Sequence, residues 1–243
     1  MQVVLSIFEL TDHVYNYFNL ELVKCFCLVS KKYYFDMRNK KWYNFCVSLN
    51  CNSVNEIKTI VSNFNFKKYS LVHLNEFKLR VTDEIVSFFS DCHTLNLFGC
   101  SQITDRGIIN LVKCHTLILS RCYDITDTGI KELRDCKVLK LSECNITDIS
   151  VESLCNCSEL DLSYCYKITN NSVRKLVNCL TLDLTWCLKI TNEALIGLIK
   201  CRRLYLLKLA IKHCDAEELK RLNPNIRIIY NYFGLIDNNL KYS

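Results

Sequence analysis

A cysteine recurs at nearly constant spacing between residues 92 and 201, and this period constrains the fold more than any other feature of the chain. Six cysteines follow one another at intervals of 22, 22, 21, 22 and 22 residues, at positions 92, 114, 136, 157, 179 and 201. Between them the pattern Leu-x-Leu-x-x-Cys repeats, as in Leu117, Leu119 and Cys122. A fixed period of this length predicts a solenoid of stacked structural repeats rather than a globular core.

Each repeat has two structural halves. The two leucines of Leu-x-Leu face the same side of a short strand, because strand side chains alternate between faces. After the second cysteine, Ile-Thr-Asp precedes apolar residues spaced three apart, such as Ile108 and Leu111, which is typical of one or two helical turns. The expected fold class is therefore α/β: a leucine-rich-repeat solenoid with parallel strands on its concave face and short helices on its convex face, preceded by a small N-terminal all-helical module.

An Asp or Asn follows a threonine where each predicted helix begins. Asp and Asn are good N-cap residues, because their side chains accept hydrogen bonds from the first amides of a helix. We therefore predict that these residues are N-caps and prefer this to the alternative of an acidic binding stripe. The positions are Asp105, Asp127, Asp148, Asn170 and Asn192.

The repeats extend beyond the six cysteines in both directions. An entry repeat covers 81–92, with its strand expected near 71–74 and out of register. The repeat that begins at Cys136 lacks one residue between Cys144 and Ile146, and a local change in stacking is expected there. C-terminal to the last cysteine we predict, in order, a strand at 204–206, a helix at 215–222 ended by Asn223-Pro224, and a closing strand at 226–228.

The chain has 243 residues, a length that fits one solenoid and one small additional module. The predicted boundaries are a small helical module at 1–48, a connecting or capping helix region at 49–69, the solenoid at 70–230 and a tail at 231–243. The module is expected to hold helices at 7–18, 20–32 and 39–48, and the connector one helix near 56–64.

Seventeen cysteines are many, yet eleven of them occupy two fixed positions of successive repeats, where they act as small buried apolar residues. The odd count predicts reduced thiols, hence the cytosol or the nucleus. Because no Cys-x-x-Cys occurs, we expect no metal site and no cofactor. The abundance of Asn, Ile, Lys and Tyr is typical of an AT-rich genome, such as that of a protist or a large DNA virus; for a virus the compartment would be the host cytoplasm.

Charge argues against nucleic acid as a partner. Residues 1–68 hold 9 Lys and Arg against 5 Asp and Glu, a net charge of +4, which leaves 22 against 20, or +2, for residues 69–243 out of the total of +6. The repeats thus lack a basic stripe. The sequence also contains no apolar run long enough for a membrane span, and residues 1–8 lack the basic start of a signal peptide.

The N-terminal region carries a resemblance to a known family. Residues 17–33, from Tyr17-Phe18-Asn19-Leu20 to Val29-Ser30-Lys31-Lys32-Tyr33, resemble the middle of an F-box, in which an aromatic-Leu pair is followed by a polar turn and an apolar helix that ends in Val-Cys-Lys-x-Trp. Glu9 and Leu10 match the acidic-apolar pair near its start. The opening Leu-Pro of the family is Ser6-Ile7 here, and Tyr33 stands in place of the Trp.

The repeats are similar to the cysteine-containing class of leucine-rich repeats, which often follows an F-box, although they are about four residues shorter. The two resemblances together imply the substrate-recognition subunit of a Skp–cullin–F-box ubiquitin ligase. A Skp-type adaptor and the cullin core would be its partners, together with an unknown target protein. The residues implied to bind the adaptor are Glu9, Leu10, Val14, Phe18, Leu20, Val23, Phe26, Val29 and Tyr33.

The side chains that flank the buried leucines are expected on the concave face. Aromatic residues with a few charges are common at interface hot spots, so we predict that this face binds the target. The predicted target-binding residues are Phe98, Lys140, Asp161, Tyr164, Asp183, Trp186 and Tyr205. Tyr164 and Trp186 could equally just cover the solenoid edge.

Catalysis is the weaker interpretation of the same residues. Asp161 and Asp183 are expected exposed and about 5 Å apart on neighbouring strands, but an open sheet offers no closed pocket to shift their pKa values. His93 follows Cys92 and His115 follows Cys114, but sequence neighbours point apart and no third orienting group recurs. We therefore predict a non-enzymatic protein with no small-molecule substrate. The alternative function is an interaction scaffold, or an inhibitor, with no ubiquitin role.

Overall fold

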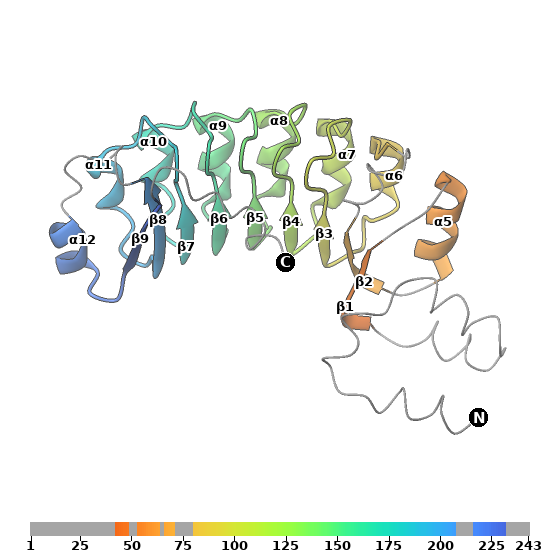
Figure 1. The fold of residues 1–243 in the computed structure, drawn as a ribbon, viewed down its shortest axis with the longest axis horizontal. Coiled ribbons are helices and arrows are strands. Elements are labelled where there is room, and N and C mark those ends of the chain that lie inside the picture. Colours follow the sequence, from red (N-terminus) through yellow and green to blue (C-terminus); the bar gives the residue numbers. More distant parts are fainter. Residues whose placement is uncertain (1–41, 49–52, 64–65, 71–79, 208–215, 232–243) are drawn as a thin grey trace, which may run out of the picture.

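The computed structural model describes residues 42–48, 53–63, 66–70, 80–207 and 216–231. In these ranges nine strands form one parallel sheet whose spatial order follows the sequence, β1 to β9. The sheet runs along one side of a gently curved body, and short helices line the other side (Figure 1). This is the expected α/β leucine-rich-repeat solenoid.

The repeats follow the predicted alternation of strand and helix. The strands are β1 (Trp42–Ser48), β2 (Phe66–Ser70), β3 (Thr94–Asn96), β4 (Thr116–Ile118), β5 (Val138–Lys140), β6 (Glu159–Asp161), β7 (Thr181–Asp183), β8 (Arg203–Leu207) and β9 (Arg227–Asn231). The α-helices are α5 (Val54–Asn63), α6 (Asp83–Ser87), α7 (Asp105–Ile108), α8 (Asp127–Ile130), α9 (Asp148–Val151), α10 (Asn170–Val173), α11 (Asn192–Leu195) and α12 (Ala216–Leu222). Three of them continue as 3-10 turns, η2 (Ile109–Leu111), η3 (Lys131–Leu133) and η4 (Glu152–Leu154).

The N-terminal end of the sheet differs from the prediction. The expected third helix at 39–48 is wrong over residues 42–48, which form β1 and pair in parallel with β2. Its Trp, Tyr, Phe and Val residues favour strand over helix. The entry strand is β2 at 66–70, in register with β3, rather than near 71–74. The connector helix is confirmed as α5, and its Ile57 and Ile60 lie in the common core.

The other helices predicted in the N-terminal module, and the tail from residue 232 onward, lie outside the described residues. The domain boundaries therefore stay a prediction. At the C-terminal end the strand, the final helix and the closing strand are confirmed as β8, α12 and β9. The residue missing from the repeat that begins at Cys136 is absorbed in the turn between Cys144 and Ile146. The expected change in stacking is wrong for the strands, because Leu139 and Leu160 stay paired in the common register.

A threonine, not the acidic residue, occupies the N-cap position of helices α6 to α11, and in α7 to α10 its hydroxyl caps the helix. Thr126 adopts the extended N-cap conformation before α8 and its hydroxyl accepts a hydrogen bond from the Thr128 amide. Asp127 is the first residue inside the helix and turns toward the next repeat. Its carboxylate accepts hydrogen bonds from the Thr147 amide at 2.8 Å and from the Thr147 hydroxyl at 2.6 Å. The N-cap prediction for the Asp and Asn positions is therefore wrong, and these residues link repeats instead.

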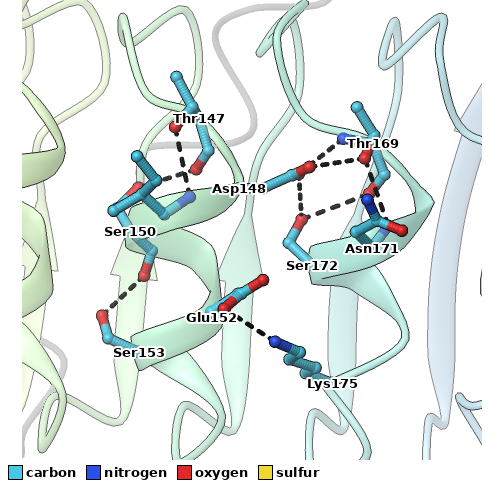
Figure 2. Close-up of polar contacts among 10 residues, drawn as sticks. Thr147, Asp148, Ser150, Glu152, Ser153, Thr169, Asn171, Ser172 and Lys175 are labelled. Carbon is cyan, nitrogen blue, oxygen red and sulfur yellow. Dashed lines mark hydrogen bonds and ion pairs between the residues drawn. The ribbon is translucent and has the colours of Figure 1, made fainter.

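This Asp–Thr clamp recurs along the solenoid with nearly constant geometry. The clamped pairs are Asp83–Thr104, Asp105–Thr126, Asp127–Thr147, Asp148–Thr169 and, with an amide in place of the carboxylate, Asn170–Thr191. Figure 2 shows the clamp at Asp148, where the Ser172 hydroxyl donates a third hydrogen bond at 2.6 Å. The clamp leaves room only for small residues beside it. A Cβ at Gly129, for example, would lie 2.6 Å from Asp105 Oδ1.

In the four repeats that contain Cys122, Cys144, Cys165 and Cys187, this second cysteine links neighbouring repeats within the core. Cys144 Sγ donates to the Leu119 carbonyl of the preceding repeat at 3.2 Å, and Cys187 Sγ donates to the Leu162 carbonyl at 3.0 Å. A thiol is small, apolar and still a weak donor, so it fills the core and pairs a buried carbonyl. Burial raises the pKa of Cys144 and Cys187 to about 12. The cysteines of both positions are buried free thiols, as predicted.

The clamp predicts a graded response to substitution of Asp127. Asp127→Ala removes the acceptors of two partly buried donors, the Thr147 amide and hydroxyl, and should lower the free energy of unfolding by about 2 kcal/mol. Asp127→Asn should cost less than half of that, because Asn170 makes both contacts at the same position. Urea unfolding measures both values. The exposed Asp124 is the control, and Asp124→Ala should change stability by less than about 0.5 kcal/mol. Equal costs for Ala and Asn at position 127 would contradict the clamp.

The buried thiols predict a loss of stability at alkaline pH. Thiols of the unfolded chain lose their protons near the ordinary value of 9.0, whereas Cys144 and Cys187 stay protonated in the fold to about pH 12. The unfolded state therefore binds fewer protons in this window, and the free energy of unfolding falls as the pH rises through it. Urea unfolding at about pH 8 and about pH 10 measures the slope. The double variant Cys144→Ala, Cys187→Ala should show a shallower slope; identical slopes would refute the assignment.

Candidate protein-binding surface

One row of side chains crosses the open face of the sheet, opposite the helices. The third residues of strands β3 to β7, and Tyr205 of β8, pair in register from strand to strand. Toward the C-terminal half this row lines a groove of about 290 Å³. The groove is formed by Val138, Leu139, Lys140, Glu159, Leu160, Asp161, Thr181, Asp183, Arg203 and Tyr205. Four of the predicted target-binding residues are thus brought together, namely Lys140, Asp161, Asp183 and Tyr205.

The two aspartates of the groove are buried and hold turns. Asp161 and Asp183 are register partners, as predicted, but only 8% and 5% exposed, so the expectation of exposed carboxylates is wrong. Asp161 Oδ1 accepts hydrogen bonds from the Ser163 amide at 3.0 Å and the Ser163 hydroxyl at 2.6 Å. Asp183 Oδ1 accepts from the Thr185 amide at 2.9 Å. Such bonds to an amide two residues ahead stabilise a turn, so both aspartates shape the segment that follows their strand.

That segment is a tight turn with an unusual backbone. In each repeat the cysteine amide closes the turn onto the second leucine, as Cys165 N–H does onto the Leu162 carbonyl at 3.1 Å. The residue before the cysteine has a positive φ, a conformation that favours glycine. The first repeat has Gly99 there at 71°, but the next four have larger side chains. They are Arg121 at 63°, Glu143 at 61°, Tyr164 at 61° and Trp186 at 65°.

These five residues, which we call the turn row, follow one another along one edge of the sheet. The backbone sets their alignment, since the Tyr164 amide donates to the Thr185 carbonyl of the next repeat at 2.8 Å, and equivalent bonds join the other turns. Arg121 Nε and Glu143 Oε1 lie 2.8 Å apart. The rings of Tyr164 and Trp186 stack with centroids 5.8 Å apart and planes at 18°. The turn row therefore holds an ion pair followed by an aromatic pair.

The remaining predicted residues fall into two groups. Phe98 precedes the turn row and lies under the Arg121 guanidinium, 5.4 Å from its ring centroid. The predicted adaptor-binding residues lie outside the described residues. Sequence reasoning missed the Arg121–Glu143 pair and Tyr166, whose ring meets that of Tyr164 edge-on at 6.4 Å. The one available signal was Gly99, which marks the position of the positive φ in the repeat.

The histidines and cysteines considered for catalysis do not converge. Cys92 Sγ lies in the core, 3.3 Å from Cys114 Sγ, whereas the His93 ring is exposed and stacks on His115 with centroids 4.6 Å apart. Partial burial, with His115 and Lys68 adding to it, lowers the pKa of His93. Among the described residues no group of three or more His, Cys, Asp or Glu is placed to hold a metal ion. Every helix in the described ranges is too short or too polar to cross a bilayer.

Comparison with known proteins agrees with the fold. A family model described as "Leucine Rich repeat" matches residues 137–155. A search of curated protein sequences gives no significant match. The repeat match and the fold agree on a solenoid of leucine-rich repeats.

Several solved solenoids are similar to the chain at low identity. TLR13 in its complex with ssRNA13 is 16% identical over 79% of this chain and 34% of that chain, with a TM-score of 0.50. Toll of Drosophila, in its complex with Spatzle, is 9% identical over 67% and 23%, with a TM-score of 0.50. An internalin from Listeria monocytogenes is 22% identical over 59% and 42%, with a TM-score of 0.47. The chain covers less than half the length of each, and the likeness concerns the fold alone.

The positive φ of the turn row predicts that a glycine variant is more stable there than an alanine variant, the reverse of the usual order. Tyr164→Gly and Tyr164→Ala both remove the ring, but only glycine accepts a positive φ without cost, so the Gly variant should be more stable by about 1 kcal/mol. Thermal or urea unfolding measures the difference. Tyr166 lies in the same turn without a positive φ, and there the Gly variant should be the less stable of the two. The same order at both positions would contradict the strained backbone.

Proposed function

We propose that this chain is the substrate-recognition subunit of a Skp–cullin–F-box type ubiquitin ligase, in which the repeats hold the target. The observation that carries the binding role is the surface formed by the groove and the turn row, which presents aromatic rings and charges on an elongated, preformed sheet. Exposed aromatic residues on a rigid scaffold are typical of interface hot spots. The adaptor role rests on the resemblance of residues 17–33 to an F-box.

The mechanism is one of position rather than of bond chemistry. A chain that holds the adaptor at one end and the target on the repeats keeps a target lysine near the ligase, which raises its effective concentration. No side chain of the repeats needs to act as an acid, base or nucleophile in this role. We propose the cytosol or the nucleus as its site of action, because eleven cysteines serve as buried thiols in the core.

Co-purification with a eukaryotic Skp-type adaptor tests the proposal. The full-length chain should hold the adaptor, and the double variant Val23→Asp, Phe26→Asp should lose it, because both substitutions put charge into the implied docking helix. Ile149→Asp is the matched control, since Ile149 is an exposed apolar residue of α9 and is not among the residues implied to bind the adaptor. Truncation at residue 49 is a poor control, because it removes β1 from the sheet.

A scaffold or inhibitor without ubiquitin function is the second candidate. The observation that favours it is β1, which joins the solenoid sheet directly after the F-box-like stretch, as a capping element would. A full-length chain that is monodisperse alone and binds no Skp-type adaptor would support this candidate and refute the ligase role. An inhibitor would in addition form a tight complex that blocks its partner without any ligase present.

A further inference from the structure

An exposed aromatic patch lies at the C-terminal part of the turn row. It consists of Tyr164 and Tyr166 in one turn and of Trp186 and Leu188 in the next, and we call these four residues the aromatic edge. Tyr166 and Leu188 are 54% and 55% exposed, and the stacked rings of Tyr164 and Trp186 are half-buried. The Tyr166 ring meets the Tyr164 ring edge-on. Four large side chains on two adjacent turns are a cluster rather than scattered surface residues.

The backbone of Tyr164 and Trp186 is strained, at a position where the stability of the fold alone would favour glycine. Tyr164 and Trp186 both have a positive φ at a turn position that Gly99 fills without strain in an equivalent repeat. Bulky residues are uncommon in this conformation, and such strain is often retained where a side chain is needed for function. Two aspartates, Asp161 and Asp183, fix these same two turns through their hydrogen bonds to the amides. The two rings are therefore held in a defined place.

The charge along this edge changes sign at the aromatic edge. The residue before the isoleucine of the turn is Asp124 in an early repeat and becomes Lys167 and Lys189 beside the aromatic residues. Both lysines are exposed. The first helix residue changes in step, from Asp127 and Asp148 to the neutral pair Asn170 and Asn192. At the same two repeats, one position thus gains a lysine and the other loses its carboxylate.

We propose that the aromatic edge binds an acidic, extended segment of a protein partner, with an apolar or prolyl side chain on the Tyr164–Trp186 stack and carboxylates toward Lys167 and Lys189. The mode resembles the docking of extended peptides on aromatic surfaces, with the lysine charges selecting acidic sequences. The inference deepens the proposed function, because it names the chemistry of the target. It depends on the protein-binding role of the repeats and not on the ligase role.

A peptide fits this surface better than a single-stranded nucleic acid does. Stacked aromatic rings also suit bases, but nucleic-acid binding needs a basic groove that follows many phosphates. Here the basic residues beside the aromatic edge are two lysines. The neighbouring groove contains more acids than basic residues, namely Glu159, Asp161 and Asp183 against Lys140 and Arg203. A polyphosphate chain would meet these acids, whereas a short acidic segment can remain on the lysine side.

The test uses the full-length chain and a labelled peptide, Glu-Glu-Pro-Leu-Glu-Glu, followed by fluorescence anisotropy. Trp186 emission in a Trp42→Phe background reports the place of binding, because the chain has two tryptophans. We expect saturable binding below about 1 mM with a change in Trp186 emission. The peptide Lys-Lys-Pro-Leu-Lys-Lys and the peptide Glu-Glu-Gly-Ser-Glu-Glu should bind at least about tenfold more weakly, since one has the wrong charge and the other lacks the apolar group.

Two variants identify the contact. Lys167→Glu with Lys189→Glu should weaken the acidic peptide about tenfold or more, whereas Lys175→Glu with Lys200→Glu, two exposed lysines away from the aromatic edge, should not. Trp186→Gly should also abolish binding while keeping the fold, because glycine relieves the positive φ.

Three results would overturn the inference. They are no saturation by the acidic peptide, equal binding of the basic peptide, and preference for an oligothymidylate over the peptide. Failure of the adaptor to co-purify, with peptide binding intact, would refute the ligase role alone.

Discussion

The solenoid depends on one repeated interaction, the Asp–Thr clamp between neighbouring helix starts. In a repeat protein each repeat contacts only its neighbours. Its stability is therefore approximately the sum of the stabilities of the single repeats and of the interfaces between adjacent repeats. Each clamp places a carboxylate of one repeat on the amide and hydroxyl of the threonine that caps the next helix, as Asp105 does for Thr126. The threonine hydroxyl in turn accepts from its own helix at the Thr128 amide. One side-chain pair therefore caps a helix and fixes the spacing to its neighbour.

Two further rows of hydrogen bonds between neighbouring repeats fix the same spacing. In the core the cysteine thiols donate to the leucine carbonyls of the preceding repeat. At the far edge the amides of the turn row donate to carbonyls of the following repeat. Because all three rows repeat with the period of the chain, strand register survives the one-residue deletion between Cys144 and Ile146. The deletion falls in a turn segment that none of the three rows uses.

The repeating strands and helices could be predicted from the sequence, whereas contacts between residues of neighbouring repeats could not. Period-two leucines and period-three apolar residues are local signals, so the strands β3 to β9 and the short helices were predictable. The role of Asp127 was not, because its partner Thr147 is 20 residues distant and a local rule makes Asp an N-cap candidate as good as Thr. The strand β1 was missed because its aromatic and β-branched residues were assigned to the module before them. The turn row carries only one local signal, Gly99.

The candidate surface consists of side chains at turn positions whose backbone the stacked repeats fix, and most of these side chains are not the glycine that the backbone favours. A solenoid that only had to stack would place glycine at every turn position that requires a positive φ, since glycine costs least there. Four successive repeats place Arg, Glu, Tyr and Trp instead, and these side chains pair with one another along the edge. The stacked rings recover part of the cost of the strained backbone, because aromatic contacts are themselves favourable. The exposed Tyr166 and Leu188 beside them recover none of it through burial. Stacking of the repeats therefore accounts for the backbone of this edge but not for its side chains, which are the part that the proposed contact with a partner explains.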